Sequence, residues 1–402
     1  MTGRACLCLV FAVCLAGCGQ RSPSMAERAN YLIGYTDMQR DDPRGQFYNW
    51  RTRRAMIIRA DGSGQREIGS SWITTQNHWT GFGGWWPDGR AIVNVSWESP
   101  ENYAWEKEHK TFRMTEGNWL IDGCLVDLRS GEMVNLTAVD RVSSYNAGLA
   151  PWPGDPTRAK FAPLINGIQH PFAMDIDGHN KTDLSSGEEG FTYGASVSPD
   201  GQLIAYNKNY LVYIAEKDGS NPRRVDEDPA HTFQFVPQFS PDGQWVLFLS
   251  GQHYKCHPYL VRSDGTGLRK LADRGAYSGS FEPLKHPDFH SSGSDMPTWS
   301  PDSRWVYFNA QVGESVELMR VSVEGKLEQL THSPAGTAHF YPSVSPDGKL
   351  VAFGRQHDGV AALYVADADG RNAKAITEPT ADHVQMYPTW APVPAAPPAG
   401  RD

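Results

Sequence analysis

Short apolar runs alternate with polar turn residues along most of this chain, and residues 340–378 show the pattern in full. Two of these runs, Leu350–Phe353 and Ala362–Val365, follow an apolar lead-in at 339–344 and precede a last short run at Ala375–Thr377. Runs of this length, bounded by turn residues, are typical of β-strands rather than helices. The segment therefore predicts four consecutive antiparallel strands, named A to D in chain order.

A tight turn between the A and B strands carries the tetrapeptide Ser-Pro-Asp-Gly. Proline fixes one φ angle, aspartate hydrogen-bonds its own backbone, and glycine takes the left-handed conformation that closes a hairpin. The tetrapeptide is intact at Ser198–Gly201, Ser240–Gly243 and Ser345–Gly348, altered at Ser300–Ser303, and degenerate at Trp86–Gly89 and Trp152–Asp155. A repeat of about 40 to 50 residues that carries four strands is typical of a β-propeller blade.

Seven sets of B, C and D strands follow from this template. They begin at Tyr31, Ala91, Lys160, Leu203, Trp245, Trp305 and Leu350. The first set has no A strand before it, and the A strand at Tyr387–Trp390 has no B strand after it. The pattern predicts an all-β fold, a seven-bladed β-propeller over residues 31–392. A C-terminal inner strand completes the N-terminal blade, which removes exposed sheet edges.

The repeat resembles that of the TolB-type propeller family, in which Pro-x-Trp-Ser-Pro-Asp-Gly precedes an apolar strand and a later Asp-Gly turn. The resemblance is strongest from Phe191 to Trp390. It implies the fold, whereas function in such families sits in loops grafted onto the scaffold. No Gly-x-Ser-x-Gly nucleophile motif is present, so peptidase activity is not expected.

The N-terminus has the pattern of a bacterial export signal, with an apolar run at 7–13 followed by Leu15-Ala16-Gly17-Cys18. That last string resembles a lipobox. It implies a lipoprotein signal peptide at 1–17, acylation of Cys18 and a polar tether at 18–30. The residue after the cysteine is Gly19 rather than Asp, which by the same resemblance implies anchoring to the outer membrane, on its periplasmic side. The alternative is an ordinary cleaved signal peptide, and a Pro/Ala-rich tail is expected at 393–402.

Charge and composition narrow the choice of partners. The net charge is -9 and no blade holds a cluster of Lys and Arg, which argues against nucleic acid. No later stretch approaches membrane-spanning length, so a lipid is the only expected membrane contact. Cys124 and Cys256 fall in the second and fifth blades, too far apart for a disulfide. Cys124 is expected in the core and Cys256 in a loop.

The histidines gather on one side of the predicted disc. The A–B and C–D turns form one face, named the short-turn face, while the B–C loops and the D-to-A crossings form the opposite, long-loop face. Several histidines directly precede inner strands, so we expect them at the mouth of the central channel, bound to one divalent metal such as Mn, Zn or Ca. This set is His231, His290, His339 and His383. The alternative is that they are solvated or cap strand ends.

Other residues of the long-loop face are predicted to bind a ligand. They are His78, His253, His257, Arg40 and Arg44. In or beside the first B–C loop, guanidinium groups next to the aromatic residues at 47–50 would suit an anionic sugar. These arginines are Arg40, Arg44, Arg51, Arg53 and Arg54. The alternative is a loop in which these arginines pair with neighbouring aspartates. Aromatic residues around 97–119 would form either a lid over the channel or a small core of their own.

Two functions remain open. The first is a non-enzymatic, lipid-anchored propeller of the cell envelope that binds a protein or an acidic oligosaccharide at its long-loop face. The second is a metal-dependent lyase resembling the oligogalacturonate lyases, in which a metal would neutralise a uronate carboxylate and a neutral histidine would act as base. The ligand string of that family, Gln-x-x-His-Pro-His-Pro, is matched only in pieces, at Lys285–His290 and Gln169–Pro171.

Overall fold

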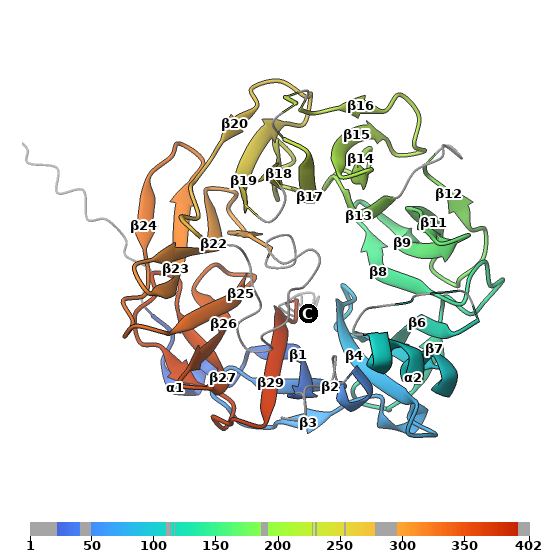
Figure 1. Ribbon diagram of the computed structural model, residues 1–402, viewed down its shortest axis with the longest axis horizontal. Helices are drawn as coiled ribbons and strands as arrows, with labels where there is room; N and C mark the ends of the chain where they lie inside the picture. The colour runs from blue at the N-terminus through green and yellow to red at the C-terminus, as the bar shows by residue number, and fades with distance from the viewer. Residues whose placement is uncertain are drawn as a thin grey trace, which may run out of the picture.

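The computed structural model describes residues 22–40, 50–109, 113, 115, 117–185, 192–226, 228–229, 231–252, 255–277 and 296–392. Within these residues, small antiparallel sheets stand around a common axis, as Figure 1 shows. The chain passes once around this ring, and its last strand returns beside its first. This arrangement is that of a β-propeller, so the predicted β-propeller fold is confirmed.

Five of the sheets are separate and have four or five strands. The first contains β29 (His383–Trp390), β1 (Leu32–Gln39), β2 (Arg54–Arg59) and β3 (Arg66–Glu67). The second contains β4 (His78–Trp85), β5 (Ala91–Glu98), β6 (Trp119–Val126) and β7 (Met133–Asn135). The third contains β8 (Asn146–Trp152), β9 (Asp155–Ile165), β10 (Ile168–Gln169), β11 (Phe172–Asp175) and β12 (Thr182–Asp183). The fourth contains β13 (Thr192–Val197), β14 (Leu203–Lys208), β15 (Leu211–Glu216) and β16 (Arg223–Arg224). The fifth contains β17 (Phe233–Phe239), β18 (Trp245–Gln252), β19 (Lys255–Arg262) and β20 (Arg269–Lys270).

A further sheet has eight strands. They are β21 (Thr298–Trp299), β22 (Trp305–Val312), β23 (Ser315–Ser322), β24 (Leu327–Gln329), β25 (Ala338–Val344), β26 (Leu350–His357), β27 (Val360–Asp367) and β28 (Lys374–Ala375). The helical elements are short: α1 (Met25–Arg28), α2 (Pro100–His109) and the 3-10 turns η1 (Trp50–Thr52) and η2 (Ser70–Trp72). Among the residues described, no helix combines the length and the apolar character needed to cross a membrane.

The ring is closed by the pairing of β1 with β29. These strands run antiparallel from Ile33 opposite Trp390 to Gln39 opposite His383. The indole of Trp390 donates a hydrogen bond to the carbonyl of Ser343 at 2.8 Å and meets the ring of Tyr31 edge-on at 5.8 Å. The predicted closure by a C-terminal inner strand is therefore confirmed.

The Ser-Pro-Asp-Gly turns have the chemistry that the sequence predicts. In the turn before β26, the Ser345 hydroxyl donates to Asp347 at 2.8 Å and accepts from the Leu350 amide at 3.0 Å. Gly348 has a φ of 72°, which glycine adopts without strain. In the altered copy, Ser303 takes this left-handed conformation with a φ of 60°. Each hairpin is thus closed by side-chain and backbone bonds within the turn.

The hydrophobic core lies between neighbouring sheets. Ile33, Tyr35 and Ile58 of the first sheet form one buried cluster with Leu350 and Leu363 of the last strands. Close packing also explains a glycine in β1, because a Cβ atom at Gly34 would lie 2.0 Å from the ring of Phe82. Burial of such apolar faces on both sides of each sheet is the main stabilising contribution to the ring.

Two expectations about local structure differ from what is observed. Residues 22–30, expected within a polar tether, fold against the propeller because Ser24 and Glu27 cap α1 and Arg28 pairs with Asp367 at 2.9 Å. Cys256, expected in a loop, is fully buried in β19, because the pairing of β18 with β19 continues through Gly251 opposite Cys256 to Gln252 opposite Lys255. Cys124 lies in the core, as predicted.

Candidate ligand-binding site in the central channel

Three inner strands carry a β-bulge at a residue that precedes proline. These residues are Val236, Tyr341 and Tyr387, with φ angles of 47°, 52° and 55°. A positive φ is uncommon for such side chains, and a bulge re-aims the side chain of the extra residue. The rings of Tyr341 and Tyr387 lie 4.2 Å apart, and their hydroxyls are 3.3 Å apart. Two neighbouring inner strands therefore place a pair of phenols side by side.

Arg53, directly before β2, lies among these phenols and that of Tyr145, which directly precedes β8. Because β25, β29 and β8 are inner strands of different sheets, their side chains converge only around the axis of the ring. Gly81 borders the guanidinium, since a Cβ atom there would lie in ordinary contact with Nη2 of Arg53, at 3.6 Å. Arg53, Tyr145, Tyr341 and Tyr387 are named the channel cluster.

Burial dominates the electrostatics of the channel cluster. It lowers the pKa of Arg53, and the three phenols partly offset this effect. It raises the pKa of Tyr145, which the charge of Arg53 opposes. Arginine and tyrosine both keep their protons at neutral pH, so the cluster holds a fixed positive charge and hydrogen-bond donors but no general base. Such a set can bind a carboxylate and contact the flat face of a sugar.

A second polar cluster lies under helix α2, in the long loop around residues 97–119. Glu98 is 1% exposed, and its Oε1 accepts a hydrogen bond from Asn102 at 2.8 Å. Asn102 also donates to Glu106 at 3.1 Å, within the helix. The bond from Asn102 to Glu98 joins the helix to β5. The guanidinium of Arg51 stacks 3.6 Å from the ring centre of Tyr103, on the same helix. These contacts join the described part of this loop to β5 and to Arg51, and whether its aromatic residues act as a lid or a core stays a prediction.

The buried carboxyl of Glu98 gives a testable pH dependence. Burial raises its pKa from 4.5 to about 7, with Glu106 adding to the effect and Asn102 and Arg51 opposing it. The folded state therefore holds the proton more tightly than the unfolded chain, and this contribution to stability is lost as the pH rises from 4.5 through about 7. We expect Glu98→Gln to match the wild type near pH 4.5 and to be more stable by about 2 kcal/mol at pH 8. Urea unfolding at both pH values measures this. The exposed Glu132→Gln is the control, and an equal effect of Glu98→Gln at both pH values would contradict the prediction.

Three of the four histidines predicted to bind a metal lie in the described residues, and each of these three has a protein partner. His231 Nδ1 lies 2.6 Å from Asp226, and His383 Nδ1 lies 2.7 Å from Asp37. His339 is 2% exposed and donates from Nδ1 to the carbonyl of Val316 at 2.8 Å. Across the described ranges, no three or more His, Cys, Asp or Glu side chains form a group that could hold a metal ion. His290 lies outside these ranges, so the four-histidine site stays a prediction.

Of the five residues predicted to bind a ligand, His78, His257 and Arg40 are described, and each has a separate partner. His78 Nδ1 lies 2.8 Å from the hydroxyl of Thr75, and burial lowers the pKa of this imidazole. His257 accepts from the amide of Arg274 at 3.1 Å, and burial lowers its pKa as well. Arg40 donates to Gln356 at 2.9 Å. His253 and Arg44 lie outside the described residues, so ligand binding at these five positions stays a prediction.

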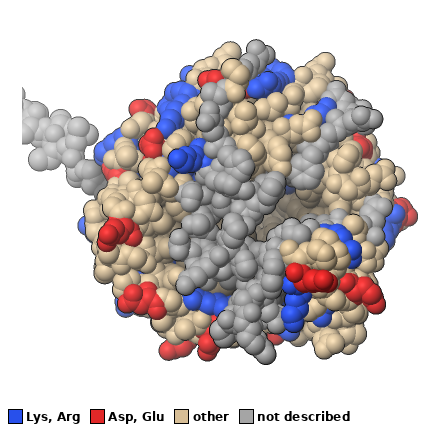
Figure 2. Space-filling model, viewed as in Figure 1, with Lys and Arg blue, Asp and Glu red and all other residues tan. Residues whose placement is uncertain are grey.

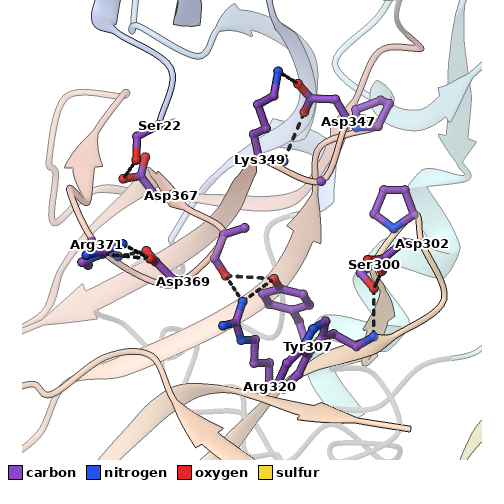
Figure 3. Close-up of a pocket in the computed structure, with 15 residues that line it drawn as sticks. Ser22, Ser300, Asp302, Tyr307, Arg320, Asp347, Lys349, Asp367, Asp369 and Arg371 are labelled. Atoms are coloured by element: carbon purple, nitrogen blue, oxygen red, sulfur yellow. Dashed lines mark hydrogen bonds and ion pairs between the residues drawn. The ribbon is translucent and has the colours of Figure 1, made fainter. Parts of the chain in front are cut away.

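Two cavities of the described structure open on the short-turn face. The smaller, about 450 Å³, lies between the A–B turns at 300–302 and 346–349 and the C–D turn at 367–371. Figure 3 shows that its charged side chains already pair with one another: Lys349 with Asp347, and Arg371 with Asp369. A larger cavity, about 1370 Å³, lies beside it and is lined by turns of the first two sheets. Charges that are already paired leave the smaller cavity few groups for a ligand.

Sequence reasoning missed the channel cluster. The available signal is the pair of matching segments Phe340-Tyr341-Pro342-Ser343 and Met386-Tyr387-Pro388-Thr389, in which a tyrosine precedes proline inside an A strand. Proline cannot donate to a sheet ladder, so its presence in a strand indicates a bulge. The sequence does place Arg53 beside the first B–C loop as a candidate for an anionic sugar, but nothing in it indicates that Arg53 meets these two strands.

Comparisons with known proteins agree with this architecture. A family model described as the TolB beta propeller domain matches residues 168–394. An uncharacterized protein of Agrobacterium fabrum is 26% identical over 211 residues, which cover 49% of this chain and 65% of that protein, under two thirds of its length. An oligogalacturonate lyase in complex with manganese is 12% identical, with 86% of this chain and 85% of that chain covered and a TM-score of 0.53. TolB from Acinetobacter baumannii is 13% identical, with 80% and 85% covered and a TM-score of 0.44. At 12% identity, the likeness to the oligogalacturonate lyase shows the fold alone.

Proposed function

Because the chain belongs to the TolB β-propeller domain family, we propose that it is an extracytoplasmic propeller, anchored by a lipid at Cys18, that binds a ligand in its central channel. The binding end is the long-loop side, where Arg53 and Tyr145 directly precede their strands. The ligand class is an acidic oligosaccharide, because a fixed guanidinium suits carboxylates and flat phenol rings suit sugar faces. The channel cluster is the observation that carries this proposal.

The proposed propeller has seven blades. In the eight-stranded sheet, β21 to β24 and β25 to β28 each repeat the four-strand order of the other sheets. The two halves are joined through β23 and β25 by a single parallel pair, Val316 with Ala338. One bridge of this kind is a contact between neighbours rather than a continuous sheet, which supports two blades here beside the five separate ones.

Binding rather than catalysis follows from the chemistry of the channel cluster. A lyase needs a group that removes a proton, and Arg53 and the three tyrosines keep their own protons at neutral pH. Of the described histidines at the channel, His231, His383 and His339 bond through Nδ1 to Asp226, Asp37 and the Val316 carbonyl, and none of them belongs to the channel cluster. The cluster is therefore suited to hold an anion without transforming it.

Calorimetric titration with oligogalacturonate and with a neutral oligosaccharide of equal length tests this proposal. We expect the acidic ligand to bind more tightly, and Arg53→Gln to weaken its binding at least tenfold, which is about 1.4 kcal/mol. Arg129→Gln, an exposed change on the short-turn face, is the matched control. Equal binding of both sugars, or an unchanged affinity of Arg53→Gln, would contradict the proposal. Unsaturated product in the presence of Mn²⁺ would favour the lyase instead.

A further inference from the structure

The N-terminal segment of the described chain, residues 22–28, packs against the short-turn face through hydrogen bonds and an ion pair. The carboxylate of Asp367, at the end of β27, accepts from the Ser22 hydroxyl at 2.7 Å and from Arg28 at 2.9 Å. The Arg28 and Asp367 side chains are 4% and 5% exposed, so this is a buried ion pair. Figure 3 shows Ser22 and Asp367 at the rim of the cavity between two A–B turns. This contact fixes where the chain leaves the propeller.

The distance from this point to the proposed anchor is short. Cys18 precedes Ser22 by four residues, which span at most about 14 Å when fully extended. The disc is deeper than this, because strands such as β1 and β18 have eight residues and are about 26 Å long. An acyl chain on Cys18 can therefore reach a membrane at the short-turn face but not one at the long-loop face.

One region of the short-turn face, the larger cavity, has a small excess of basic side chains that can face lipid headgroups. The larger cavity there is lined by five basic side chains, Arg59, Arg66, Arg90, Arg129 and Lys349, and by four acidic ones. The chain as a whole has a net charge of -9, so this region is more positive than the average surface. Basic residues near an anionic leaflet each contribute about 1 kcal/mol of attraction. In the view of Figure 2, charges of both signs are interspersed around the ring.

We propose that the propeller rests with its short-turn face against the phospholipid headgroups of the membrane that holds its anchor, and with its long-loop face turned away. This orientation rests on the proposed acylation of Cys18. The pairing of Arg28 with Asp367 sets it, because this contact keeps the tether short. The channel cluster then opens toward the aqueous compartment, where a soluble ligand can enter.

Cysteine accessibility on vesicles tests the orientation. The native Cys124 and Cys256 are fully buried, so they give little background with a polar maleimide. Lys217→Cys places a thiol on an exposed C–D turn of the fourth sheet, and Glu314→Cys places one on the exposed B–C turn between β22 and β23. Each variant is labelled as lipidated full-length protein on phosphatidylethanolamine/phosphatidylglycerol vesicles and as soluble Cys18→Ser protein. We expect the vesicles to slow labelling of Lys217→Cys several-fold and to leave Glu314→Cys unchanged.

Three outcomes would overturn parts of the proposal separately. Wild type and Cys18→Ser that fractionate alike would remove the anchor itself. Equal labelling of both sites on vesicles, or protection of Glu314→Cys, would show anchored protein with another orientation. The third arm uses Arg28→Ala with Asp367→Asn, which removes the contact without leaving a buried charge. It frees the thirteen residues from Cys18 to Tyr31, about 45 Å of chain, and should abolish the protection. Unchanged protection would show that this contact does not set the orientation.

Discussion

A chain that ends at residue 383 is expected to lose cooperative folding. The deletion removes nearly all of β29, whose Val384, Met386 and Trp390 are 0%, 3% and 6% exposed. It also leaves β1 with unpaired backbone groups along the inner edge of its sheet. Unpaired edges and lost apolar burial act together, because the first and last sheets share one core cluster. Circular dichroism and urea unfolding measure the loss.

A point substitution in β29 separates the stability that its buried side chain contributes from the stability that its pairing with β1 contributes. Trp390→Ala keeps β29 but removes the indole that packs on Tyr31 and donates to Ser343, and we expect it to lower the free energy of unfolding by about 3 to 5 kcal/mol. Thr389→Ala, one residue away and partly exposed, should change stability by less than about 0.5 kcal/mol. A chain shortened only to residue 392 should have the same melting temperature as the full-length protein. If the chain that lacks β29 also had this melting temperature, closure would not stabilise the ring.

The course of the chain around the ring is predictable from its turns. Ser345, Asp347 and Gly348 bond mainly to one another and to Leu350, so their chemistry is local and recurs wherever the tetrapeptide recurs. The orphan strands at the two ends then predict the pairing of β1 with β29. The docking of residues 22–30 was not predicted, because it depends on a contact between residues far apart in the sequence. Arg28 finds its partner Asp367 across 339 positions of sequence, and no local pattern announces such a contact.

The candidate site was less predictable because the direction of a side chain depends on contacts between blades. The sequence places histidines on the long-loop face, but His383 is held by Asp37, 346 positions away, and His231 by Asp226 of its own crossing. Tyr341 and Tyr387 would alternate with their neighbours in a regular strand, and only the bulge brings their rings together. The sequence thus predicted on which face a side chain lies, whereas only the structure showed which side chains meet at the axis of the ring.

His339 is the residue at which a structural role and the metal hypothesis predict different results. Its imidazole is buried against Phe353, donates to the Val316 carbonyl, and lies 3.6 Å from the Glu317 carboxylate. We expect His339→Ala to lower the free energy of unfolding by about 2 to 4 kcal/mol, because it leaves a cavity and an unpaired buried carbonyl. Asn at this position can still donate to Val316, so His339→Asn should lose less. Urea unfolding of the three proteins at pH 8 measures the difference.

The pH dependence gives a second measurement on the same proteins. Burial lowers the pKa of His339 below 6.5, with Arg355 acting in the same direction and Glu317 and the Val316 carbonyl against it. The unfolded chain then binds the proton more tightly, so stability present above pH 6.5 should be lost as the pH falls below it. His339→Asn should lack this part of the acid destabilisation. The metal hypothesis expects instead that His339→Ala keeps wild-type stability and pH dependence in the absence of metal and loses only a bound ion. Elemental analysis beside the unfolding curves therefore decides whether His339 supports the fold or binds a metal.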